Sequence, residues 1–275
     1  MPGVLKFAAI ALYALAFVVI LWRTHNLDEN RRDSNRSLML AAWGAACLAH
    51  ATYLYPHTFT AQGLNLTFYN VVSILFFIVA ALILVLATAR KGELLGLLVL
   101  PLVMVSIALT IYKPEVAAST VNLHGLQLHI VTSLFAFSVL VISALQSILL
   151  FSQDRHLRRH QLSGMTRALP PLHDTEKFLF QTIAVGFILL SAALITGFLF
   201  LEDMFEQHVA HKTILSVLAW LIFAMLLLGR WQFGWRGSIA MRWTLGGFGF
   251  LLLAYLGSKF VQELILHRGI FVPVT

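Results

Sequence analysis

Charge is the scarcest property of this 275-residue chain, since Asp, Glu, Lys and Arg together make up 11% of it. Hydrophobic residues make up 59%, and the mean hydropathy is +0.85. No soluble protein core needs so much apolar surface with so few charges around it. The composition therefore excludes a soluble globular protein and predicts an all-α polytopic membrane protein.

Cysteine is almost absent as well, because Cys47 is the single one in the sequence. One cysteine excludes an intramolecular disulfide, and its place inside an apolar run predicts a small packed side chain. The sequence also lacks a Walker A loop, a dinucleotide-binding glycine fingerprint, a nucleophile elbow and the zinc motif HExxH. No catalytic residue is therefore predicted, and the sequence gives no reason to expect an enzyme.

Long apolar runs are what the chain has instead. About 20 apolar residues in a helix span a hydrocarbon core of about 30 Å, and eight such runs follow one another. The runs cover residues 4–22, 38–55, 68–88, 94–112, 128–151, 178–201, 213–228 and 244–264. The seventh is the shortest, and the longest connection, 152–177, is too short for an independent domain. We predict one integral membrane domain over residues 1–275, with about eight transmembrane helices and no soluble domain.

The positive charges are distributed unevenly between the connections. Of the 19 Lys and Arg residues, 14 fall on the odd-numbered connections and five fall near the other side. Cytoplasmic loops of membrane proteins carry the excess of Lys and Arg. The bias predicts that both termini lie outside the cytoplasm. It also attributes the net charge of +7 to topology in a lipid bilayer, and not to nucleic-acid binding.

Histidine is concentrated on the predicted outer side, where seven of the 11 histidines fall. Four different helices bring an imidazole to a similar depth there, at His50, His129, His211 and His267. Imidazole is a common ligand of haem iron and other metals, so two of these rings are predicted to bind opposite faces of one planar ligand. For His50, inside a span, a functional role is the default. The alternative for each is a helix cap or an interfacial hydrogen bond.

The stretch EDMFEQHVAHK offers a second kind of site. His208 and His211 share a helix face if the seventh helix extends outward by a turn. Two such imidazoles are suited to Zn(II), with Glu202, Asp203 or Glu206 as further ligands. The spacing alone does not decide whether a metal binds.

Three segments carry a family resemblance: AQGLNLTFYNVVSILFF, LQLHIVTSLFAFSVLVISALQSILLF, and residues 202–269 with HKTILSVLAW and GWRG. In this order they resemble the CcsA-type cytochrome c assembly and haem-handling superfamily, which includes HemX-like proteins, and within it the small bacterial YpjD-type inner-membrane branch. The resemblance implies haem held by paired external histidines, matched by His129 and His267. His50 lies near an expected membrane-embedded histidine. His211 lies where a tryptophan-rich external segment passes into its helix.

One departure from the family pattern concerns tryptophan. All six tryptophans fall in spans or near the predicted cytoplasmic side. The tryptophan-rich platform that presents haem to apocytochrome c is therefore missing, and the resemblance supports haem contact more than ligation of cytochrome c.

The leading hypothesis is a haem-binding or haem-handling protein of the bacterial inner membrane, with haem between His129 and either His211 or His267. His50 is the candidate for an inner site. An accessory or assembly subunit of a membrane complex, with a membrane-protein partner and no cofactor, is the alternative. A cation or small-solute transporter ranks last, because it needs polar groups deep in the bundle. Few are present: Ser73, Gln146, Gln181, Ser191 and Thr196.

Overall fold

The structure is a computed structural model that describes residues 2–25, 29–60, 63–89, 92–110, 120–121, 126–158, 171–200, 210–257 and 260. Almost all of these residues are helical. Seven of the helices are long and apolar enough to cross a membrane, judged by length and composition. The predicted all-α polytopic membrane fold is confirmed.

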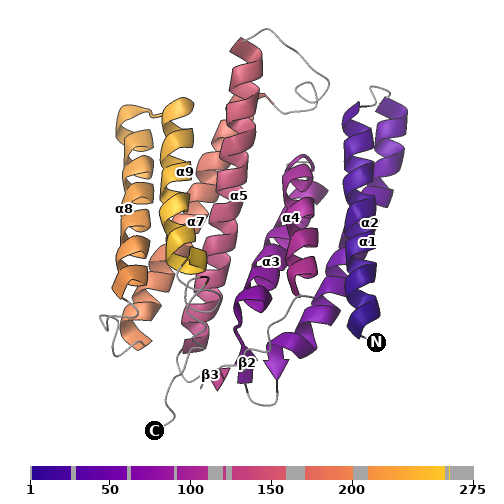
Figure 1. Ribbon diagram of the computed structural model, residues 1–275. Helices are drawn as coiled ribbons and strands as arrows, with labels where there is room; N and C mark the ends of the chain where they lie inside the picture. Colours follow the sequence, from indigo (N-terminus) through magenta and orange to yellow (C-terminus); the bar gives the residue numbers. More distant parts are fainter. Residues whose placement is uncertain are drawn as a thin grey trace. The chain divides into compact units, whose positions relative to one another are not determined.

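The described helices divide into two compact units (Figure 1). The first unit contains α1 (Pro2–His25), α2 (Glu29–Thr58), α3 (Phe68–Thr88) and α4 (Leu95–Leu109). The second contains α5 (Leu126–Arg158), α7 (Leu172–Phe200), α8 (Ala210–Phe233) and α9 (Ser238–Leu252), which continues as a π-helical turn, η2 (Leu253–Gly257). In each unit every helix contacts the next along the chain, and the first contacts the last. Each unit is therefore a four-helix bundle.

A small antiparallel sheet lies at one end of the first unit. Its strands are β1 (Phe59–Thr60), β2 (Gly63–Asn65) and β3 (Thr120–Val121), with β2 in the middle. The Asn70 side chain donates to the main-chain oxygen of Asn65 at 2.6 Å and to Thr58 Oγ1 at 3.3 Å. These two bonds tie the sheet and the end of α2 to the start of α3.

Helix lengths correct one prediction from the sequence. The seventh run was expected to be the shortest, but α8 has 24 residues. An apolar count stops at polar residues such as His211 and Arg230, whereas the helix continues through them. Among the described apolar helices, α4 is the one that falls short of the length of a membrane span, with 15 residues and Pro101 in its interior.

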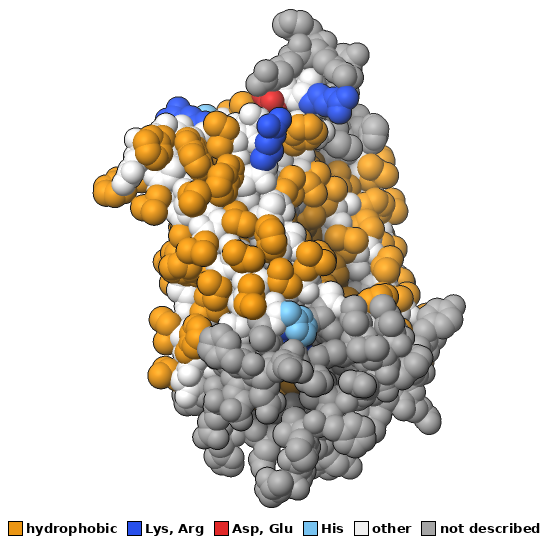
Figure 2. All heavy atoms as spheres, turned by 60° about the vertical axis from the view of Figure 1, so that its left-hand side comes forward, with side chains coloured by type: hydrophobic (Ala, Val, Ile, Leu, Met, Phe, Trp, Pro, Cys, Tyr) orange, Lys and Arg blue, Asp and Glu red, His pale blue; other side chains and the backbone are white. Residues whose placement is uncertain are grey.

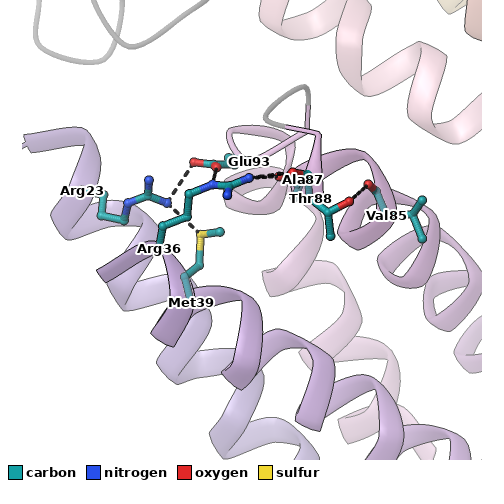
Figure 3. Close-up of polar contacts among 7 residues, drawn as sticks. All are labelled: Arg23, Arg36, Met39, Val85, Ala87, Thr88 and Glu93. Carbon is teal, nitrogen blue, oxygen red and sulfur yellow. Dashed lines mark hydrogen bonds and ion pairs between the residues drawn. The ribbon is translucent and has the colours of Figure 1, made fainter. Parts of the chain in front are cut away.

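An ion-pair network, which we call the Glu93 clasp, fastens the end of the first unit where α1 ends and α2 begins (Figure 3). Arg23 Nη1 lies 2.9 Å from Glu93 Oε2, and Arg36 Nε lies 2.6 Å from Glu93 Oε1. Arg36 Nη2 also donates to the main-chain oxygens of Ala87 and Thr88, at 2.9 and 2.8 Å. These are the last carbonyls of α3, whose negative dipole end offsets part of the second arginine charge. The clasp thus connects α1, α2, α3 and the α3–α4 turn.

A second ion pair connects α7 and α8 in the other unit. Arg230 Nη1 lies 2.8 Å from Glu176 Oε1 and donates to the main-chain oxygen of Trp235 at 3.2 Å. The guanidinium also lies over the Phe180 ring, 4.6 Å from its centroid, a contact that adds cation–π attraction. The Trp235 ring packs directly on Gly229, where a side chain would collide with it. This packing positions the turn between α8 and α9.

The outer surface of the helices is strongly apolar. Exposed side chains include Val4 at 72%, Leu48 at 72% and Leu199 at 71% of their full accessibility. Figure 2 shows hydrophobic side chains spread over one face, with Lys and Arg side chains gathered near one end of it. So large an apolar surface is unfavourable in water, but it suits contact with lipid.

Candidate functional site

The antiparallel course of α5 and α7 gives His129 its neighbours. Gln146 Oε1 on α5 accepts from Thr182 Oγ1 on α7 at 2.9 Å. Further toward the start of α5, His129 Nδ1 lies 2.9 Å from the main-chain oxygen of Ala193. The lower-numbered residue of α5 thus contacts the higher-numbered residue of α7, so the two helices are antiparallel. The first turn of α5 therefore lies beside the last turns of α7.

The contact with Ala193 determines which nitrogen of His129 carries the proton. A carbonyl oxygen only accepts hydrogen bonds, so Nδ1 is the protonated nitrogen that donates to it. The Nε2 atom of the neutral ring therefore keeps its lone pair. Metal-binding histidines have this arrangement, with one ring nitrogen on the metal and the other donating to a carbonyl or carboxylate. The ring is half-buried, so it is held in place while part of it stays accessible.

The Thr196 side chain lies next to both atoms of this contact. Its hydroxyl lies 3.5 Å from His129 Nδ1 and donates to the main-chain oxygen of Ala193 at 3.0 Å. Thr132, one turn along α5, lies 3.5 Å from the same hydroxyl. The sequence analysis considered Thr196 only as a possible transport-path residue. The spacing of residues along the chain does not indicate that Thr196 lies close to His129.

His211 lies at the same end of the second unit as His129. It is exposed at the start of α8. Trp220 Nε1 donates to Ser191 Oγ at 2.8 Å, and further along α8 Arg230 pairs with Glu176 earlier on α7, so the two helices are antiparallel. His211 precedes Trp220 by nine residues, or about 13 Å of helix, whereas Thr196 follows Ser191 by about 7 Å. His211 therefore lies about 6 Å further along the bundle than Thr196. No described contact joins the two imidazoles.

His267 lies outside the described residues. So do the predicted zinc ligands His208, Glu202, Asp203 and Glu206. Among the side chains that the structure does describe, no group of three His, Cys, Asp or Glu residues lies close enough to hold a metal ion.

His50 lies in the first unit, fully buried on α2. Its Nε2 is 3.0 Å from Ser73 Oγ on α3, and its Nδ1 is 3.4 Å from Tyr13 Oη on α1. Tyr13 Oη is in turn 3.5 Å from Cys47 Sγ. The rings of Tyr13 and Phe77 contact the imidazole edge-on. The four polar groups form a closed cluster that presents no open face of His50 to a planar ligand.

The polar groups proposed for a transport path mostly join neighbouring helices. Ser73 contacts His50, Gln146 accepts from Thr182, and Ser191 accepts from Trp220. Gln181 is exposed on α7. Hydrogen bonds between helices are a usual role for polar side chains within membrane bundles, so these contacts favour packing over conduction.

Several residues around these sites could not be found from the sequence. Tyr13 and Ser73 lie 37 and 23 positions from His50, and Ala193 contributes a main-chain atom. Each contact depends on the register between two helices, which apolar spacing does not reveal.

Fold and site together define a polytopic helical membrane protein with imidazoles at the ends of its helices. The chain matches the cytochrome c assembly protein family over residues 36–266. It therefore belongs to that family, and the predicted resemblance is confirmed. The matched range includes His50, His129 and His211 and ends one residue before His267.

Three relatives illustrate how far the similarity extends. The chain is 29% identical to inner membrane protein YpjD of Escherichia coli (strain K12) over 94% of this chain and 98% of the relative. It is 34% identical to a 28.8 kDa protein of Azospirillum brasilense over 51% and 53% of the two chains. It is 23% identical to cytochrome c biogenesis protein CcsA of Heterosigma akashiwo over 63% and 66%. No solved structure matches.

Proposed function

We propose that the protein binds haem at the end of its second unit and handles it within cytochrome c assembly, in a bacterial inner membrane. Membership of the cytochrome c assembly family and the similarity to the Escherichia coli inner membrane protein support this proposal. The observation that carries it is the contact between His129 Nδ1 and the main-chain oxygen of Ala193 at 2.9 Å. This contact leaves Nε2 as the free ligand atom.

His129 would supply one imidazole to hold the haem in this proposal. When bound, haem would supply an iron that carries one electron. The Ala193 carbonyl orients the ring and keeps Nδ1 protonated, so that the lone pair stays on Nε2. Thr196 packs beside the same nitrogen and restricts rotation of the ring.

His211 and His267 are the candidates for a second imidazole that would hold the haem. His211 is exposed at the start of α8, at the same end of the second unit as His129. His267 is the external histidine that the family resemblance implies. His50 stays a prediction for an inner site, although its two ring nitrogens already have partners.

An absorption spectrum tests the proposal. The full-length protein, purified in detergent from cells supplied with ample haem, is expected to show a Soret band. His129→Gln removes the imidazole lone pair and is expected to abolish the band. His173→Gln is the matched control, because His173 is exposed near the start of α7, about 34 Å of helix away from Thr196. Its spectrum is expected to equal that of the unmodified protein.

Two further variants assign the second ligand. His211→Gln and His267→Gln are made separately, and the true ligand is the one whose loss converts the low-spin spectrum to a high-spin one. A colourless protein refutes haem binding. If it also co-purifies with one membrane protein in fixed ratio, the accessory-subunit alternative is supported in its place. A Soret band that survives His129→Gln refutes the assignment of that ligand.

A further inference from the structure

The buried cluster of Tyr13, Cys47, His50 and Ser73 has no role in the proposed haem site. Tyr13, His50 and Ser73 are fully buried, and Cys47 is 8% exposed. The four side chains come from three helices of the first unit, α1, α2 and α3. An ionisable side chain is expensive to keep within a membrane span and by default has a function.

The longest hydrogen bonds of the cluster are those of the Tyr13 hydroxyl. The Tyr13 hydroxyl has one proton but two neighbouring acceptors, Cys47 Sγ at 3.5 Å and His50 Nδ1 at 3.4 Å. The second distance is longer than the usual range of about 2.5–3.2 Å for hydrogen bonds of hydroxyl and amide groups. By contrast, His50 Nε2 is 3.0 Å from Ser73 Oγ. If Nε2 donates to the serine, the lone pair of Nδ1 faces the sulfur and the phenol.

We propose that this cluster is a Cu(I) site in which Cys47 Sγ and His50 Nδ1 bind the ion. The two residues are three apart on α2, so their side chains emerge from the same helix face about 5–6 Å apart at Cβ. Thiolate sulfur is a soft ligand that selects Cu(I), and imidazole is also suited to copper. Ser73 orients the imidazole from the other side, as the outer partners of metal-binding histidines do.

The number of donors and the charge both favour Cu(I) over a divalent ion. A structural zinc site needs four ligands, whereas Cu(I) is satisfied by two strong donors. The described residues bring no third His, Cys, Asp or Glu to this place. Binding releases the thiol proton, so the thiolate charge of −1 cancels the Cu(I) charge of +1. With a divalent ion, a net positive charge would stay in the membrane interior, at a high desolvation cost.

Anaerobic titration with Cu(I) in competition with a coloured Cu(I) chelator tests the site. The full-length protein is expected to withdraw a single equivalent of Cu(I) from the chelator. Cys47→Ser and His50→Gln are each expected to lose that equivalent. His57→Gln is the matched control, because His57 lies on the same helix and its Nδ1 bonds the main-chain oxygen of Tyr53. This variant is expected to retain Cu(I) binding in full.

X-ray absorption at the copper edge gives a second measurement that does not depend on any variant. It is expected to show one sulfur and one nitrogen or oxygen neighbour in the Cu(I)-loaded protein. The proposal is overturned if the protein withdraws no Cu(I), if Cys47→Ser binds as much as the unmodified chain, or if sulfur is missing from the copper shell. These results are independent of the Soret band, so this inference and the haem proposal can fail separately.

Discussion

Replacing Glu93 by Gln removes the carboxylate that Arg23 and Arg36 share in the clasp. The Arg23 side chain is 7% exposed, and those of Arg36 and Glu93 are each 19% exposed. Removal of one partner from a buried ion pair costs about 3–5 kcal/mol, because the other charge is left without compensation. Partial exposure of two of the three side chains, together with the amide oxygen that Gln retains, favours the low end, about 3 kcal/mol.

Thermal unfolding of the full-length protein in detergent, followed by far-ultraviolet circular dichroism, measures this loss. A change of 1 kcal/mol corresponds to roughly 2–4 °C in chains of about 150–250 residues, so the expected decrease in Tm for Glu93→Gln is about 6–12 °C. Asp174→Asn is the control, since Asp174 is exposed in the first turn of α7. A surface change of this kind is expected to stay within about 0.5 kcal/mol.

A double-mutant cycle with Arg23→Met separates the ion pair from other effects of the substitution. If the clasp stabilises the first unit, the two changes are strongly non-additive, with a coupling of about 0.5–3 kcal/mol. The reasoning is refuted if Glu93→Gln lowers Tm no more than Asp174→Asn does. It is refuted equally if the two changes in the cycle simply add.

The remaining predictions concern glycines at close helix contacts. Gly186→Ala places a Cβ 2.6 and 2.8 Å from Leu140 side-chain atoms, and such overpacking is expected to destabilise by about 1–3 kcal/mol, measured by thermal unfolding. Gly229→Ala collides with the Trp235 ring and is expected to change the near-ultraviolet dichroism of the α8–α9 turn as well as lower Tm. Gly246→Ala meets no atom within 4 Å, so it is expected to be neutral or to stabilise by up to about 1 kcal/mol. Equal effects of all three substitutions would contradict this account.

The helices could be predicted from the sequence because a membrane requires each span to satisfy its own main-chain hydrogen bonds. All eight expected runs contain a helix in the described residues. Their ends were harder to predict: α5 extends to Arg158 and α7 begins at Leu172, beyond the apolar count in both cases. The three strands were missed because each has only two or three residues.

The candidate sites were predictable in part. Histidine position along the helices drew attention to His129, whose Nδ1 faces the main-chain oxygen of Ala193, and to His50, which is fully buried. Ligand roles for both stay predictions. The same reasoning placed the two at a similar depth, which stays a prediction; the structure describes them in different units. Their partners depend on which helices pack together and in which register, and neither property follows from apolar periodicity.

The acceptor that orients His129 belongs to the main chain of residue 193 and not to a side chain. Any amino acid that keeps α7 helical at that position supplies the same oxygen. No point substitution at position 193 removes this oxygen, and an alignment of related sequences would not show it as an invariant residue. Functional constraint at this site is therefore expected to show as conservation of a helical backbone around residue 193 and of the small side chains at Ala192 and Ala193, where α5 packs against α7.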